Sequence, residues 1–149
     1  SYYFNSALLK HIASYYGASQ IARADNDRAK PRTNTQKVAD LFAENNGSAT
    51  FFFIGNSFNK DTDEGVAKYV LSKGSEIANH SYNHKNAATM DAMTEAEFNK
   101  EFEGANALIK EKTGVTPKYW RGGGYAYSER IYEKLEEIEE QLKNGEQTK

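Results

Sequence analysis

Residues 49–55 read Ala-Thr-Phe-Phe-Phe-Ile-Gly and form a continuous run of β-prone side chains. Aromatic and β-branched residues favour strands, and the run shows none of the polar alternation of a strand with one solvated face. A strand that is apolar on both faces is typical of a parallel sheet, because helices cover both faces of such a sheet. This segment therefore predicts an α/β fold.

Helical and strand patterns alternate along the rest of the chain. Apolar spacing predicts helices over residues 2–16, 35–44, 63–73 and 94–114, and a last helix from Ser128. Short strands are predicted over residues 21–24, 76–78 and 118–121, and a polar loop over residues 25–35. Strands that alternate with helices through short connections indicate an α/β domain with parallel strands.

Composition narrows the classes of function. The 149 residues suit a single domain, and the net charge of −2 at pH 7 gives no electrostatic case for binding nucleic acid or an anionic membrane. The chain has no cysteine, which excludes disulfides and thiolate metal sites. No apolar run approaches the ~18 residues that a membrane span needs, and the N-terminus lacks the pattern of a signal peptide.

Two histidines follow the predicted strand at residues 76–78. A strand that runs into a turn can bring His80 and His84 to one point. Two neutral imidazoles are good ligands for a zinc-like divalent metal. The alternative is a pair of surface side chains, or a turn with satisfied hydrogen bonds. Ligands in parallel α/β folds bind outside the carboxyl ends of the strands, where these histidines, Arg121 and residues 25–27 are all expected.

Three segments resemble the motifs of one enzyme family. Residues 49–56 resemble the strand after its first motif, and residues 74–84 resemble its second motif, His-(Ser/Thr)-x-x-His after a Glu-Ile-x-Asn lead. Residues 113–124 resemble its third motif, Arg-x-Pro. In order and spacing, over roughly residues 33–138, the chain is similar to the polysaccharide deacetylases with a NodB-homology domain, carbohydrate esterase family four.

This resemblance implies a distorted, TIM-barrel-like (β/α) barrel and a metal-dependent hydrolase. In that family, an aspartate and two histidines hold a divalent metal, which activates water and polarises the acetamide carbonyl of an N-acetylated sugar. Carried over to this chain, the metal ligands are Asp27, His80 and His84. The expected cofactor is one zinc ion, with cobalt, nickel or manganese as alternatives. The expected partner is an N-acetylated polysaccharide such as chitin or peptidoglycan, which implies an extracellular or cell-wall location.

The resemblance also implies catalytic roles. In the family, an aspartate acts as the base and a histidine of a late motif protonates the leaving amine. Asp25 and Asp27 are the candidates for the base, and Arg121 is the residue expected to orient it. The backbone around residues 122–125 is expected to line the substrate groove.

The first motif departs from the family pattern Thr-Phe-Asp-Asp-Gly-Pro, because residues 22–28 read Ala-Arg-Ala-Asp-Asn-Asp-Arg. If Asp27 takes the metal-binding place, Asn26 falls at the base, and an amide cannot take a proton at neutral pH. If Asp25 is the base, the spacing must be irregular. The remaining interpretation is a surface loop rich in Asp and Asn.

The later motifs depart further. Gly123 replaces the proline of the third motif, and neither the Asp-rich fourth motif nor the Leu-x-His fifth motif follows the last helix. Residues 9–11 read Leu-Lys-His but precede every other motif. His11 could therefore act as the acid only if the chain were permuted or the element were exchanged between chains; otherwise it is a surface residue.

We predict one deacetylase-like α/β domain over residues 1–149, with an N-terminal helix in residues 1–20, a core in residues 21–138 and a charged tail in residues 139–149. At most four strands cannot close a barrel that normally uses about seven or eight, so the barrel is expected to be partial and incomplete as a monomer. Its open edge and uncovered face favour a homo-oligomer, or else a plug formed by the N-terminal helix.

Three functions remain open at this point. The first is a metal-dependent deacetylase of a polymeric amino sugar. The second is a catalytically inactive deacetylase-like fragment that acts as a carbohydrate-binding, structural or self-assembling module. The third is an unrelated α/β assembly module whose histidines are surface residues.

Overall fold

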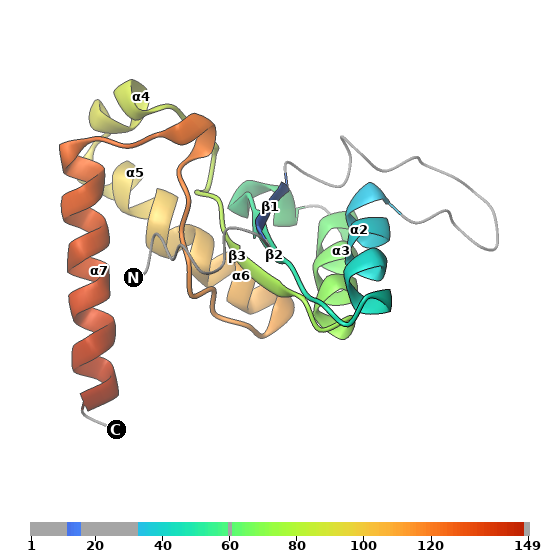
Figure 1. Cartoon of the computed structure of the whole chain (residues 1–149). Helices are drawn as coiled ribbons and strands as arrows, with labels where there is room; N and C mark the ends of the chain where they lie inside the picture. The colour runs from blue at the N-terminus through green and yellow to red at the C-terminus, as the bar shows by residue number, and fades with distance from the viewer. Residues whose placement is uncertain (1–11, 16–32, 60, 148–149) are drawn as a thin grey trace.

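The computed structural model describes residues 12–15, 33–59 and 61–147, in which helices surround a small sheet (Figure 1). In chain order its elements are β1 (Ile12–Tyr15), α2 (Asn34–Glu44), β2 (Thr50–Phe53), a 3-10 helix (Gly55–Asn59), α3 (Asp61–Ser72), β3 (Glu76–Asn79), α4 (Ala87–Asp91), α5 (Glu95–Asn99), a π-helical turn (Lys100–Gly104), α6 (Ala105–Thr113), a 3-10 helix (Gly123–Tyr125) and α7 (Glu129–Gln147). None of the described helices is long and apolar enough to span a membrane.

The three strands form one parallel sheet in the order β1-β2-β3. Thr50 of β2 aligns with Ile12 on one side and with Glu76 on the other. All four residues of β2 are buried, as the apolar run at residues 49–55 predicts. The parallel arrangement and the strand predicted at residues 76–78 are likewise confirmed.

The strand predicted over residues 118–121 is reduced to a single bridge. Trp120 pairs with Asn79, and the backbone N–H of Arg121 donates to the carbonyl of Asn79 at 2.9 Å. Within the part of the chain that the structure describes, no further residue of this segment pairs with β3. Beyond Arg121 the chain turns into a short 3-10 helix, so the sheet gains no full fourth strand here.

β1 corrects the prediction of an N-terminal helix over residues 2–16. Residues 12–15 are extended and pair with β2, so long-range pairing overrides a local apolar spacing that also suits a helix. The remaining predictions for this part of the chain lie outside the described residues: the rest of the helix, the strand at 21–24, most of the loop at 25–35, His11, Asp25 and Asp27.

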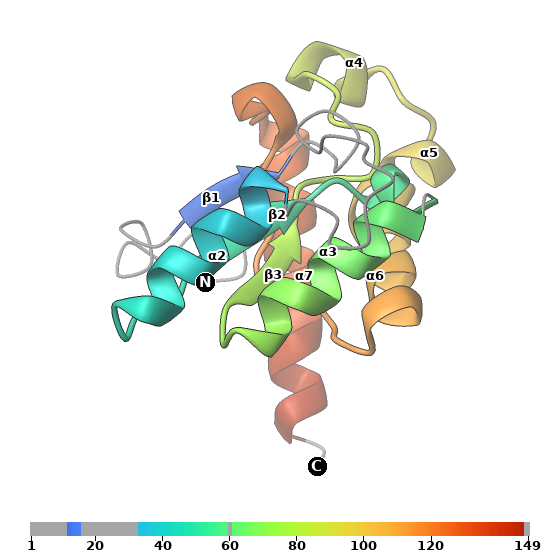
Figure 2. The ribbon, with the colours of Figure 1, turned by 90° about the vertical axis from the view of Figure 1, so that its right-hand side faces the viewer.

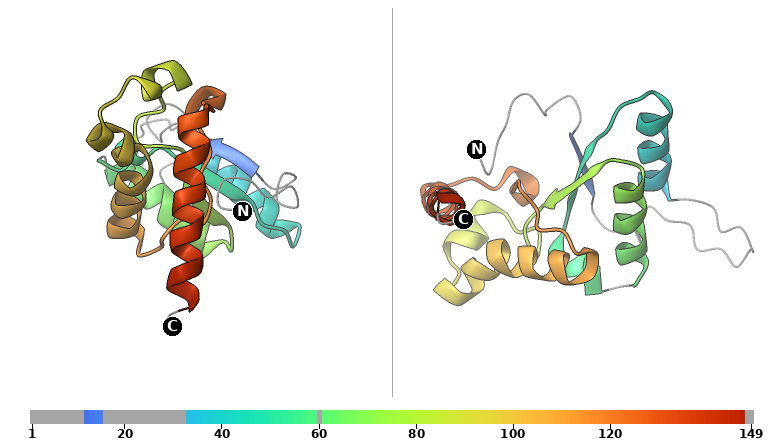
Figure 3. Two further views of the ribbon diagram at one scale, coloured as in Figure 1. Left: turned by 90° about the vertical axis from the view of Figure 1, so that its left-hand side faces the viewer. Right: turned by 90° about the horizontal axis from the view of Figure 1, so that it is seen from below.

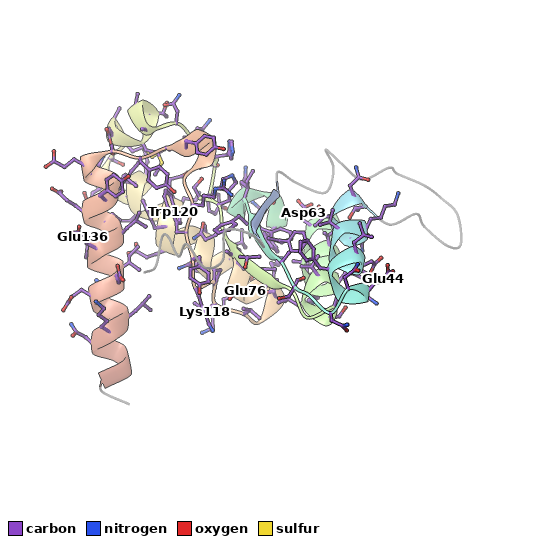
Figure 4. The ribbon with its side chains drawn as sticks, in the orientation of Figure 1. Glu44, Asp63, Glu76, Lys118, Trp120 and Glu136 are labelled. Carbon is purple, nitrogen blue, oxygen red and sulfur yellow. The ribbon has the colours of Figure 1, made fainter. Side chains whose placement is uncertain are left out.

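Two clusters of buried side chains hold the helices against the sheet. Phe51, Phe53 and Ile77 of the strands pack with α2, α3 and α6, and Figure 2 shows α2 and α3 lying side by side along the strands. The second cluster joins α4, α5, the π-helical turn and α7 around Trp120, which Figure 4 shows between α7 and the strands. The two views of Figure 3 place α7 on the opposite side of the strands from α2 and α3.

The helices begin largely where the sequence predicts. The capping box at Thr94 is formed, and Gly114 ends α6 in the left-handed conformation. The single helix predicted over residues 94–114 is interrupted by the π-helical turn, and the short α4 was not predicted. α7 continues through most of the segment predicted as a charged tail, residues 139–149.

Candidate metal-binding site

His80 is the first residue after β3, and only 2% of its surface is exposed. Its Nδ1 lies 2.9 Å from the backbone carbonyl oxygen of Arg121. Because a carbonyl oxygen can only accept, Nδ1 carries the proton, and the lone pair of the neutral ring lies on Nε2. A hydrogen bond of this kind orients histidine ligands in metal sites. The fold therefore presents His80 in the tautomer that binds a metal through Nε2.

The pKa of His80 supports the same protonation state. Burial away from water lowers this pKa from 6.5 to about 4, with smaller lowering contributions from the charges of His84 and Arg121. The hydrogen bond to the Arg121 backbone opposes the shift only in part. The ring is therefore neutral at pH 7, which is the form that a metal requires.

His84 lies beside His80 across the turn. The centroids of the two imidazole rings are 4.8 Å apart and their planes are inclined by 71°. The Nε2 atoms of both rings are shielded from solvent. The backbone of His84 is left-handed, with φ of 55°, and its N–H donates to the Ser81 hydroxyl oxygen at 3.0 Å. The turn thus brings together the two histidines that the sequence paired.

Gly123 packs directly against the backbone of His84. A Cβ at position 123 would lie 2.7 Å from the Cα of His84 and 2.8 Å from its Cγ, closer than real side chains approach. The glycine that stands where the family has proline therefore lets this loop reach the histidine turn.

Arg121 reaches the site through its backbone and its side chain. Its carbonyl accepts from His80, and its guanidinium carbon lies 5.7 Å from the ring centroid of Phe52 and 5.9 Å from that of Tyr125. Both distances are within the cation–π range. Phe52 also meets the His80 ring edge-on at 6.4 Å. Arg121 is thus the third predicted site residue that the structure places here, with His80 and His84.

Asp25 and Asp27 lie outside the described residues, so their place relative to the histidines stays a prediction. Within residues 33–59 and 61–147, no group of three His, Cys, Asp or Glu side chains could hold a metal ion. The donors among the described residues are therefore two imidazoles, which suit two positions of a zinc-like site but do not complete one.

Two buried polar residues hold the turn: Asn79, identified from the sequence only as the end of the lead to the second motif, and Glu101, which was not identified from the sequence. The Asn79 Oδ1 accepts the Ser81 N–H at 2.8 Å, and its Nδ2 donates to the Phe102 carbonyl at 3.0 Å. The carboxylate of Glu101 accepts from the backbone N–H and the side-chain amide of Asn83, at 2.9 and 2.8 Å. One sequence feature could have pointed to Glu101: it directly precedes Phe102, which lies on the apolar face of the helix predicted over residues 94–114.

Comparison with known proteins identifies the family. A family model described as polysaccharide deacetylase matches residues 25–142, a span that includes His80, His84 and Arg121. This chain belongs to the polysaccharide deacetylase family. The family predicted from the three sequence motifs is therefore confirmed.

Curated relatives in this family act on different polymers. A bifunctional xylanase/deacetylase of Pseudobutyrivibrio xylanivorans is 29% identical over 106 residues, which cover 71% of this chain and 17% of that protein. A peptidoglycan-N-acetylglucosamine deacetylase of Bacillus cereus is 29% identical over 58% of this chain and 30% of its own length. A chitin deacetylase of Amylomyces rouxii is 32% identical over 61% of this chain and 20% of its own. The chain thus spans less than a third of each.

Solved structures show the fold. The Xyl-CE4 domain of a multidomain xylanase from the hindgut metagenome of Trinervitermes trinervoides matches with a TM-score of 0.59 and 27% identity, over 69% of this chain and 49% of that one. A CE4 family pseudoenzyme of Bacillus anthracis, at 15% identity, matches with a TM-score of 0.66 over 85% of this chain and 39% of that one. The structure described here is a partial (β/α) barrel of the deacetylase type, as predicted.

Proposed function

We propose that this chain carries the metal-binding part of a deacetylase that hydrolyses the acetamide groups of chitin- or peptidoglycan-like polymers. The observation that carries the proposal is the pairing of His80 with His84. The first ring is fixed by the Arg121 carbonyl, and the second lies 4.8 Å from it, centroid to centroid. Adjacent imidazoles whose Nε2 atoms are both shielded from solvent, at the carboxyl end of a parallel strand, are suited to a divalent cation.

His80 and His84 would hold this ion through Nε2, and Asp27 is the proposed third ligand. A divalent ion held there would supply Lewis acidity for activating water and polarising the acetamide carbonyl. Zinc is the proposed metal because it accepts imidazole and carboxylate ligands without a strong geometric preference. Cobalt, nickel and manganese remain alternatives for the same donor set.

Three further roles are proposed: a catalytic base, a group that orients it, and a lining of the substrate groove. Asp25 or Asp27 would take a proton from the attacking water, and the Arg121 guanidinium would orient that carboxylate. The loop at residues 122–125 would line the substrate groove. In support, the side chain of Tyr125 is 80% exposed beside Arg121, and a phenol ring can pack on the apolar face of a sugar.

The proposal is tested by measuring metal content and acetate release on one purified sample. We expect one divalent ion per chain, acetate release from chitin or peptidoglycan oligosaccharides, and loss of both in His80→Ala. The matched control is Lys85→Ala, an exposed change next to the same turn. Acetate release that survives His80→Ala would refute the proposed mechanism.

A second candidate is a deacetylase-like module without catalysis. It is favoured by two departures from the family motifs: Asn26 falls at the place of the base if Asp27 binds the metal, and Gly123 replaces the proline of the third motif. This candidate predicts no acetate at any metal concentration from a folded sample. Turnover that is lost on chelation and restored by zinc or cobalt would exclude it.

Self-association is proposed for either candidate. In the described residues, the outer edge of β1 pairs with no strand, and beyond β3 there is only the bridge to Trp120. Unpaired edges of this kind favour pairing with another chain. The native mass, measured by light scattering, is expected to exceed that of one chain, and a monomeric mass would contradict this proposal.

A further inference from the structure

Glu101 is a carboxylate buried beneath the histidine turn, with 1% of its surface exposed. Its two oxygens accept the backbone N–H and the side-chain amide of Asn83, at 2.9 and 2.8 Å. No lysine or arginine of the described residues forms an ion pair with it. Burying a carboxylate is costly unless its oxygens are satisfied, so the two charge-assisted bonds to Asn83 are its main compensation here.

The backbone around Glu101 is also fixed. Glu101 lies in the π-helical turn between α5 and α6, a departure from α-helical geometry that is common at functional sites. Its carbonyl accepts the indole N–H of Trp120 at 3.1 Å. The Trp120 ring in turn stacks on Phe102, with 4.5 Å between centroids. The carboxylate is therefore held at a defined place under the turn.

The turn that Glu101 holds has an unfavourable backbone conformation. Ser81 and His84 are both left-handed, with φ of 64° and 55°. This conformation is uncommon for residues other than glycine, and it persists where surrounding contacts impose it. Asn83 directly precedes His84, so its two hydrogen bonds to Glu101 restrain the backbone at the point where His84 begins.

We propose that Glu101 is a positioning residue that holds His84 beside His80 through Asn83, so that both rings can bind one divalent ion. The inference rests on the proposed metal site. The effect is specific to one ligand, because His80 is held independently by its bond to the Arg121 carbonyl. Without Glu101, the backbone at His84 can relax and its ring can leave the site while His80 stays.

The test uses a polarity exchange between the two partners. Glu101→Gln keeps the size of the side chain but removes its charge and turns one of its two acceptors into a donor, so Asn83 can keep both bonds only by turning its amide over. The double variant N83D/E101Q places a carboxylate at position 83. The backbone N–H of residue 83 can still donate to residue 101, and the second bond is restored in the reverse direction, from the introduced amide at position 101 to the introduced carboxylate at position 83. Glu111→Gln, an exposed change on α6, removes the same charge and serves as the control.

Zinc binding by calorimetry is the first measurement. We expect Glu101→Gln to weaken zinc binding at least about tenfold, as removal of outer-shell partners of metal ligands does. Glu111→Gln should bind as the wild type does, and N83D/E101Q should recover to within about threefold of it. Wild-type affinity in Glu101→Gln, or no recovery in the double variant, would overturn the inference.

A second measurement needs no metal. NMR contacts between the rings of His80 and His84 should be lost in Glu101→Gln and regained in the double variant, while the Nδ1–H signal of His80 persists throughout. If the wild type binds no zinc, the proposed metal site fails, and these ring contacts alone decide the role of Glu101. Unchanged contacts would overturn it. If Glu101→Gln does not fold, Asn83→Ala takes its place with the same outcomes.

Discussion

The imidazole of His80 is oriented by the backbone of Arg121, whose carbonyl oxygen lies 2.9 Å from Nδ1. The second motif is therefore positioned by the main chain of the third, not by a side chain. The bridge between Trp120 and Asn79 sets this distance, because it fixes where the third-motif strand meets β3. The Arg121 guanidinium is left to interact with the rings of Phe52 and Tyr125.

This division of roles predicts that Arg121→Ala separates metal binding from activity. The carbonyl at position 121 remains, so zinc affinity should stay within about threefold of the wild type. Acetate release should fall on the order of 100-fold, because the proposed base loses its orienting group. Calorimetry and an acetate assay measure the two effects on one sample, with His80→Ala as the reference for lost binding. A loss of zinc affinity as large as in His80→Ala would show that the side chain, not the carbonyl, holds the site.

The burial of His80 predicts a pH dependence of stability in the metal-free protein. The unfolded chain takes up a proton near pH 6.5, whereas the folded chain does so only near its pKa of about 4. Between these values the unfolded state binds more protons, so the free energy of unfolding falls as the pH is lowered from 6.5 to 4. The loss should approach roughly 3 kcal/mol.

Urea unfolding at a series of pH values with a chelator present measures this slope. His80→Asn has no titrating group at this position, so the difference between the two curves isolates the contribution of His80. A difference that does not change between pH 6.5 and 4 would contradict the assignment of the shift to this residue.

Much of the fold around the site follows from local sequence patterns. The run at residues 49–55 predicted a strand buried on both faces, and β2 is one. The spacing of His80 and His84 predicted neighbouring rings, and they lie 4.8 Å apart. These features depend on residues close in the sequence, on side chains that strongly favour one environment, and on the resemblance to known motifs.

The features that were missed depend on distant contacts. Residues 12–15 have a spacing that suits a helix, and only pairing with β2 makes them a strand. Glu101 is charged and lies in a helix, which ordinarily indicates a solvated side chain. Its burial follows from the π-helical turn and from the two donors of Asn83, neither of which a local pattern shows.

The contact between Gly123 and His84 predicts that Gly123→Ala disturbs the histidine turn. The new methyl group would lie 2.7 Å from the His84 Cα, so one of the two backbones must move. We expect a loss of about 1–3 kcal/mol in the free energy of unfolding, together with weaker zinc binding.

Gly145→Ala is the control, because a Cβ there meets nothing within 4 Å on an exposed part of α7. It should be neutral or stabilise by up to about 1 kcal/mol. Equal stabilities for the two variants would show that the close approach is not present in solution.

The hydrogen bond from the Trp120 indole to the Glu101 carbonyl predicts that Trp120→Phe weakens the π-helical turn. Phenylalanine keeps an aromatic ring against Phe102 but leaves this buried carbonyl without the indole donor, which lies at 3.1 Å. The expected loss of stability is about 1–3 kcal/mol.

Trp120 is the only tryptophan of the chain, so unfolding must be followed by far-UV circular dichroism instead of fluorescence. Tyr132→Phe, at a position that is 44% exposed, is the aromatic control and should change stability by less than about 0.5 kcal/mol. A Trp120→Phe variant as stable as this control would show that the indole N–H does not support the turn that carries Glu101.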